Sequence, residues 1–218
     1  SVRVYQQCGF STVEGYKKFM ADGYRTGFGS DMNKIGPLKL LSDGSLGART
    51  ALMRNDYADQ AGTKGIMCVS PEQLDAFVAA SQENGMQVAI HAIGDRAIEL
   101  VLDAYEKSMN GDGNPLRHAI VHCQITRPDQ LRKIAELRLH VYAQSIFLDY
   151  DIHMVYDRVG EKLADTSYSW KTLKNLGATV SNGSDCPVEL PHVLAGIQCA
   201  VTRRNLKESV PAYLPEEA

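Results

Sequence analysis

The sequence contains no apolar run that approaches the roughly 20 residues a membrane-spanning helix requires. Its first ten residues also lack the basic start and the long apolar stretch of a secretory signal. Basic residues are scattered along the chain, and the formal net charge is only -3, which argues against a polyanionic partner. We therefore expect no binding to membranes or nucleic acids.

The cysteines form no recognisable pattern. Because they number five, they cannot all pair in disulfides, and no two of them stand in a Cys-x-x-Cys motif: Cys8, Cys68, Cys123, Cys186 and Cys199. Reduced thiols are the simplest interpretation, and they predict a cytoplasmic location.

The composition that remains is that of an ordinary globular protein. Hydrophobic residues make up 44% and charged residues 22% of the 218 residues, which excludes a disordered or collagen-like chain. We divide the sequence into one folded domain over residues 1–205 and a C-terminal tail over residues 206–218.

Short apolar runs rich in Val and Ile alternate with amphipathic stretches. Six runs are apolar on both faces, as buried parallel strands are: 3–7, 38–42, 87–91, 119–124, 140–146 and 178–182. Five amphipathic stretches predict helices: 71–84, 95–109, 128–137, 166–176 and 191–203. This alternation indicates an α/β protein with a parallel sheet.

Two architectures fit the alternation, an open doubly wound sheet and a (β/α)8 barrel. An open dinucleotide-binding sheet requires a Gly-x-Gly-x-x-Gly turn, which the sequence lacks. Polar residues instead gather at the carboxyl ends of strands, where barrels build active sites. Six strands are too few for the eight of a complete barrel. We therefore predict an incomplete TIM-type (β/α)8 barrel of about six parallel strands with flanking helices.

Four of the predicted strands bring a charged or metal-ligating residue to this carboxyl end of the sheet. Lys39 lies within an apolar run, His91 and His122 end two others, and Asp185 follows the last. A lone histidine at a strand end is usually a core or rim residue, and a salt bridge to Asp43 would also explain Lys39. Two histidines at matching strand ends, with an aspartate, favour a metal site instead.

The motifs around these residues resemble the metal-dependent amidohydrolase superfamily. They are KLLSDGSLGART (residues 39–50), HAIGDRA (91–97), HCQ (122–124) and NGSDCP (182–187), and they occur in this order. The branch that contains N-substituted formamide deformylases and related metal-dependent hydrolases is the most similar. The resemblance implies a hydrolase that uses metal-activated water on the C–N bonds of small, amide-type, non-peptide substrates.

The resemblance also implies roles for single residues. Lys39 corresponds to the strand-four lysine, which is often carboxylated and bridges two metals. His91 and His122 correspond to the metal ligands on strands five and six. Asp185 corresponds to the strand-eight aspartate, which lies at the metal and acts as the catalytic acid and base. The cofactor implied is one or two divalent ions, usually zinc.

Six further polar residues are predicted to support the metal ligands or to contact substrate: Asp43, Arg49, Asp95, Arg96, Gln144 and Asp151. A salt bridge within the loop is an equally good interpretation of Asp43 and Arg49. Asp95 and Arg96 stand where a helix begins, so capping of that helix is the alternative for both.

The sequence departs from the family pattern at its start. It contains no His-x-His pair, which in these enzymes binds one metal from strand one, and its first residue is Ser rather than Met. We therefore expect an internal piece covering strands three to eight, which is inactive alone, binds metal weakly and forms homo-oligomers through exposed barrel edges. Two alternatives stay open: a non-catalytic regulatory or binding protein similar to exoenzyme regulators, and another superfamily hydrolase such as a lactonase, phosphotriesterase or deaminase.

Overall fold

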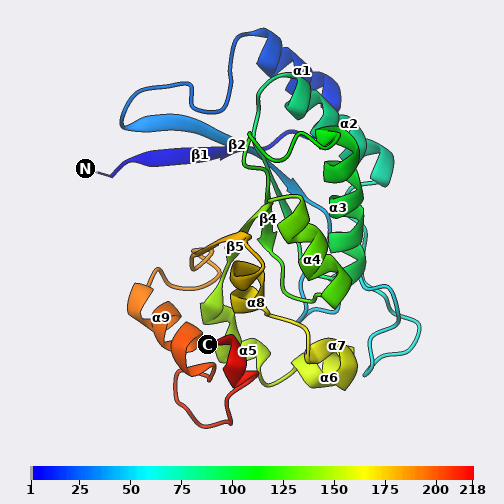
Figure 1. Ribbon diagram of the computed structural model, residues 1–218, viewed down its shortest axis with the longest axis vertical. Helices are drawn as coiled ribbons and strands as arrows, with labels where there is room; N and C mark the ends of the chain where they lie inside the picture. The colour runs from blue at the N-terminus through cyan, green and yellow to red at the C-terminus, as the bar shows by residue number, and fades with distance from the viewer. Residues whose placement is uncertain (1) are drawn as a thin grey trace.

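The computed structural model describes residues 2–218. Its single described sheet has the strand order β1-β2-β3-β4-β5-β6, with these bounds: β1 Val4–Cys8, β2 Asn33–Leu41, β3 Val88–Ala92, β4 Ala119–His122, β5 His140–Ala143 and β6 Thr179–Asn182. Each strand pairs in parallel with the next one along the chain. The sheet curls into part of a barrel (Figure 1). This confirms the predicted incomplete TIM-type barrel.

Helices follow most strands, and α2, α3, α4 and α8 each contact the next one in this series (Figure 1). The longer helices are α1 Val13–Ala21, α2 Pro71–Glu83, α3 Asp95–Met109, α4 Pro128–Glu136, α8 Trp170–Asn175 and α9 Val193–Thr202. The short ones are η1 Ser145–Phe147, α5 Leu148–Asp151, α6 Val155–Val159, α7 Glu161–Ala164 and η2 Pro215–Glu217. Among the helices of the described residues, none is long and apolar enough to span a bilayer.

Helix α2 illustrates how the sequence specifies an element locally. The Ser70 side chain accepts a hydrogen bond from the backbone of Gln73, whose own side chain bonds back to the Ser70 backbone. Leu74, Phe77 and Val78, spaced three and one residues apart, are buried on the same face. The capping and the apolar spacing both predict this helix, and the structure contains it.

Other predicted bounds are too long. The predicted strand over 140–146 ends at Ala143, and the predicted helix over 166–176 is only the six-residue α8. Helices α1, α5, α6 and α7 have no counterpart among the predicted elements. Helices α5 to α7 contain four or five residues each, which is too short for an apolar period to be visible in the sequence.

The two faces of the sheet differ in what they pack against. The main core lies between the sheet and the helices, whereas Ala89, Ala119 and Val121 form a small cluster on the opposite, concave face. In the register, Lys39 pairs with Ala89 and His91 pairs with Val121. Since paired residues point to the same face of a sheet, both Lys39 and His91 face the interior of the barrel.

The expected C-terminal tail, residues 206–218, packs against the rest of the chain. Tyr213 is buried, and its hydroxyl donates a hydrogen bond to the Ala164 carbonyl. The Glu217 carboxylate accepts a bond from the Thr172 backbone N–H at 3.0 Å. These contacts attach the tail to helices α7 and α8.

A buried histidine predicts how stability depends on pH. His118 is fully buried, its Nδ1 accepts the Val88 N–H at 3.0 Å, and its Nε2 lies 3.0 Å from Gln82 Oε1. Burial lowers the pKa of His118 from 6.5 to about 4. Because the folded pKa lies below the unfolded one, its stabilising effect is complete above pH 6.5 and declines as the pH falls towards 4. The expected loss is about 3 kcal/mol of unfolding free energy.

Urea unfolding between pH 7 and pH 4.5 measures most of this loss. His118→Gln is the matched variant, because an amide can accept from Val88 and donate to Gln82 without titrating. As the pH falls, the unfolding free energy of His118→Gln is expected to decrease by about 1.4 kcal/mol per pH unit less than that of the wild type. An identical slope in both proteins would contradict the assignment to His118.

Candidate active site

Two of the predicted metal ligands face each other. His91 lies in β3 and His122 ends β4, and their ring centroids are 4.5 Å apart with the planes at 74°. The side chains are 13% and 4% exposed. The structure therefore brings together two imidazoles that are distant in the sequence, at the carboxyl ends of adjacent strands.

The backbone at His122 makes this meeting possible. His122 pairs with Ala92, which packs in the helix-side core, so regular alternation would turn the imidazole away from the barrel interior. Instead His122 has a φ of 75° and Cys123 a φ of 51°. Positive φ is unusual for such residues and costs free energy. The turn directs the His122 ring towards His91 and leaves Cys123 buried in the helix-side core.

Hydrogen bonds determine the tautomer of His122. The Gln144 amide nitrogen donates to the Tyr142 carbonyl at 2.8 Å, so the amide oxygen is the atom that lies 2.8 Å from His122 Nδ1. An amide oxygen can only accept, and Nδ1 must therefore carry the proton. Nε2 of His122 keeps its lone pair. Burial, together with the nearby His91 and Lys39, lowers the pKa of His122 to about 3, so the ring is neutral.

The tautomer of His91 follows from similar contacts. Its Nε2 lies 2.9 Å from the Gly44 carbonyl oxygen and 3.2 Å from Asp43 Oδ1. Both neighbours are acceptors, so Nε2 carries a proton, and the lone pair of the neutral ring is at Nδ1. The fully buried Asp43 carboxylate also accepts bonds from the backbone N–H groups of Leu52, Ile93 and Gly94.

Asp185 and Lys39 complete the predicted set of ligands. Asp185 Oδ2 lies 4.0 Å from His122 Nε2, and its side chain is 42% exposed. Asp185 also has a positive φ, of 56°. Burial lowers the pKa of Lys39, and the negative charge of Asp185 partly opposes this shift. The carboxylate whose charge affects the pKa of Lys39 is therefore that of Asp185. The sequence had suggested a salt bridge between Lys39 and Asp43 instead.

The types of donor atom brought together here are those that bind a divalent cation. Two imidazoles and a carboxylate are ligands that zinc takes in catalytic sites. The N–H of each imidazole is bound by an amide, carbonyl or carboxylate oxygen, as is usual for metal-bound histidines. Within residues 2–218, no group of three or more His, Cys, Asp or Glu side chains converges closely enough to hold an ion. The described residues therefore do not form a complete metal site by themselves.

Three predicted supporting residues lie away from the histidines. Arg49 pairs with Asp59 at 2.8 Å within the loop after β2. Arg96 pairs with Glu99 along α3. Asp95 accepts a bond from the backbone N–H of Arg54 at 2.9 Å and pairs with an arginine of the next loop. These contacts stabilise loops and helix ends, and the structure does not bring the three side chains to the imidazoles.

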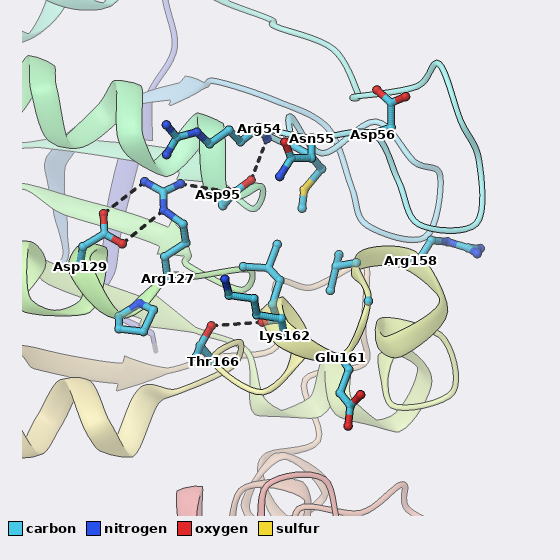
Figure 2. Close-up of a pocket in the computed structure, with 15 residues that line it drawn as sticks. Arg54, Asn55, Asp56, Asp95, Arg127, Asp129, Arg158, Glu161, Lys162 and Thr166 are labelled. Carbon is cyan, nitrogen blue, oxygen red and sulfur yellow. Dashed lines mark hydrogen bonds and ion pairs between the residues drawn. The ribbon is translucent and has the colours of Figure 1, made fainter.

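Arg127, the arginine that pairs with Asp95, borders a large cavity on the helix side. Figure 2 shows Arg127 between Asp95 and Asp129, with Lys162 across the cavity. The cavity has a volume of about 550 Å³ and lies where α3 and α4 begin. It contains none of the four predicted metal ligands, so we separate it from the candidate active site.

A smaller cavity of about 230 Å³ lies close to His122. Phe147, which lines it, stacks against His122 at 5.8 Å between ring centroids. Asp151 lies in its wall and accepts bonds from the Tyr168 hydroxyl at 2.7 Å and from Gln124 at 2.8 Å. Burial raises the pKa of Asp151. Gln124 belongs to the HCQ motif, but its residue type and position predicted no role for it.

Comparisons with known proteins agree with this geometry. Residues 2–218 match the model of a family described as the amidohydrolase family. YtcJ of Bacillus subtilis, which is named an amidohydrolase, is 36% identical over 185 residues, covering 84% of this chain and 35% of YtcJ. LONG AFTER FAR-RED 3 of Arabidopsis thaliana is 36% identical over 186 residues, covering 84% and 32%.

A solved structure is similar over most of the chain. It is the crystal structure of an uncharacterized metal-dependent hydrolase from Pyrococcus horikoshii, with a TM-score of 0.82 and 31% identity. The match covers 93% of this chain and 40% of that one. The chain thus spans about a third of the length of the curated relatives it matches.

Proposed function

This chain belongs to the amidohydrolase family, and from that membership we propose that the protein is a metal-dependent hydrolase of C–N bonds in small, amide-type, non-peptide substrates. One observation carries the proposal. His91 and His122 face each other at 4.5 Å, and the hydrogen bonds at one nitrogen of each ring leave the other nitrogen with its lone pair. The likeness to a metal-dependent hydrolase supports it.

We assign the metal to these residues. His91 would bind through Nδ1 and His122 through Nε2, with Asp185 beside them and Lys39 on the same face of the sheet. Zinc suits this set of nitrogen and oxygen donors. When bound, a divalent ion lowers the pKa of water and polarises a carbonyl. The lowered pKa of Lys39 favours the neutral amine, which is the form that carbon dioxide carboxylates.

The proton transfers fall to Asp185. Its partly exposed carboxylate can take a proton from the attacking water. The water oxygen then forms a bond to the substrate carbonyl carbon. As the C–N bond breaks, Asp185 returns the proton to the leaving nitrogen. The products are a carboxylic acid and an amine.

Elemental analysis and a substrate panel test the proposal on the full chain. We expect a bound divalent metal, and hydrolysis of N-substituted amides and N-formyl compounds in preference to lactones and phosphotriesters. If the metal-loaded protein hydrolyses none of these substrates, the proposal is wrong and a binding protein is the better interpretation. Preferred cleavage of a lactone or a phosphotriester would assign another hydrolase of the family.

Gln144 provides a sharper test of the metal assignment. Gln144→Leu removes the oxygen that holds the His122 tautomer, and we expect metal affinity to fall by about 10- to 100-fold. Gln144→Glu keeps an acceptor there and should bind metal nearly as well as wild type. Competition with a chromogenic chelator measures both affinities. Equal affinity of Gln144→Leu and wild type would count against His122 as a ligand.

A further inference from the structure

The main chain of His122 departs from the strand that it ends. His122 and Cys123 both have positive φ angles, and this conformation persists in such residues only where the surroundings hold it. The pairing of β4 with β5 stops at Val121 and Tyr142, so the carbonyl of His122 lies beyond the last pair of the ladder. Because His122 is 3% exposed, this carbonyl needs a hydrogen-bond donor from another part of the chain.

Trp170 provides that donor. It is the first residue of α8 and is 6% exposed, and its indole Nε1 donates to the His122 carbonyl at 3.2 Å. An indole N–H can only donate, and it needs a partner when it is buried. The bond therefore satisfies both groups. It also joins the end of β4 to a helix that begins 48 residues further along the chain.

The surroundings of Trp170 fix the position of its indole. Tyr168 packs edge-on against it, with the ring centroids 5.5 Å apart and the planes at 80°. Tyr168 is itself fully buried, and its hydroxyl donates to Asp151 at 2.7 Å. The Tyr168 backbone N–H donates at 2.7 Å to the carbonyl of Gln124, two residues after His122. The indole N–H is thus a donor fixed by the core.

The other contacts of His122 described above act on its ring. Gln144 Oε1 lies 2.8 Å from Nδ1, and Phe147 stacks on the imidazole. These contacts orient the ring about its side-chain torsions, whereas the main chain determines the direction of the Cα–Cβ bond. Regular alternation would turn that bond away from the barrel interior. The bond from Trp170 therefore acts on the feature that brings His122 to within 4.5 Å of His91.

We propose that Trp170 is a positioning residue for the candidate active site. Its indole N–H holds the main chain of His122 in the conformation that turns the imidazole towards His91. Without this donor, His122 relaxes towards the extended conformation and its ring leaves His91. For metal binding the inference rests on the proposed function, but the placement of the ring does not require a metal.

Replacement of a single atom tests the inference. Trp170 is the only tryptophan of the sequence, so incorporation of benzothienylalanine in place of tryptophan alters this side chain alone. The analogue carries sulfur where tryptophan has its N–H, at nearly the same shape. In NMR spectra of the metal-free full chain, we expect NOE contacts between the rings of His91 and His122, and their loss in the analogue protein. Zinc affinity, measured by competition with a chromogenic chelator, should fall by about 10- to 100-fold.

Tyr168→Phe is the matched control. It removes a buried hydrogen-bond donor next to Trp170 but leaves the bond from Trp170 to His122. This variant should keep the ring contacts and the zinc affinity, even where it lowers the midpoint of urea unfolding.

Three results would overturn the inference. They are absence of the ring contacts in the protein that contains tryptophan, their persistence in the analogue protein, and their equal loss in Tyr168→Phe. The last would make Trp170 an ordinary part of the core. Ring contacts that depend on the indole N–H, in a protein that binds no zinc, would leave the role of Trp170 standing while the proposed function fails.

Discussion

Asp185→Asn is expected to lower kcat by about 10²- to 10⁴-fold, the usual contribution of a general acid and base. The substitution keeps the size of the side chain and one carbonyl oxygen, but it removes the group that takes and returns the proton. Asp185 suits this role because its Oδ2 lies 4.0 Å from His122 Nε2 while 42% of its side chain stays open to water. Its positive φ places the carboxylate just beyond the end of β6.

The measurement combines steady-state kinetics with metal analysis of the same samples. Metal content should stay close to that of wild type at saturating metal, because both imidazoles remain. Glu189→Gln is the matched control, since this carboxylate lines the adjacent cavity without contacting His122, and it should cost less than about tenfold. An unchanged kcat in Asp185→Asn would remove Asp185 from the mechanism. A drop that follows the loss of metal would make it only a ligand.

The fold could largely be predicted from the sequence because its strands are short, apolar runs followed by amphipathic stretches. Parallel pairing of sequential strands then places the ends of β3 and β4 side by side. That is why His91 and His122 could be paired before the structure was known. Their contact, however, depends on the positive φ at His122. No residue pattern signals it, because a histidine in that conformation is held by its surroundings rather than by its own preference.

The supporting residues were harder to predict, for a different physical reason. Asp43, Arg49, Asp95 and Arg96 all belong to the motifs that contain the ligands, but nearness along the chain does not determine where a side chain points. Arg49 and Arg96 pair with carboxylates in their own segments, whereas Asp43 contacts the His91 imidazole. The contacts of Gln124 could not be predicted, because its side chain bonds to Asp151 and Tyr168, which come from later parts of the chain.

Asp43→Ala is expected to produce the largest loss of stability, at least about 3 kcal/mol of unfolding free energy. The Asp43 side chain is completely buried, and its two oxygens accept the N–H groups of Leu52, Ile93 and Gly94 at 2.8 to 3.1 Å. Alanine would leave all three donors buried without an acceptor, and each such donor costs about 1–3 kcal/mol. Urea unfolding at pH 7 measures the difference.

The control for this loss is Asp56→Ala. Asp56 lies in the same loop and accepts the Gly62 N–H at 2.7 Å, but at an exposed position where water can replace it, so a loss below about 1 kcal/mol is expected. Asp43→Asn keeps one accepting oxygen and should fall between the two. A loss of unfolding free energy for Asp43→Ala as small as that of Asp56→Ala would mean that the three backbone N–H groups bond to other acceptors.

Asp43 also connects stability to the candidate active site. It joins the loop after β2 to the loop after β3, where the Gly94 backbone approaches so closely that a Cβ there would lie 2.1 Å from the Leu52 carbonyl oxygen. The same carboxylate lies 3.2 Å from His91 Nε2 and so helps to hold the tautomer that leaves Nδ1 free. Asp43→Ala should therefore lower metal affinity together with stability, whereas Asp185→Asn should lower kcat alone. If the two effects separate in this way, Asp43 holds the imidazole in position and Asp185 transfers the proton.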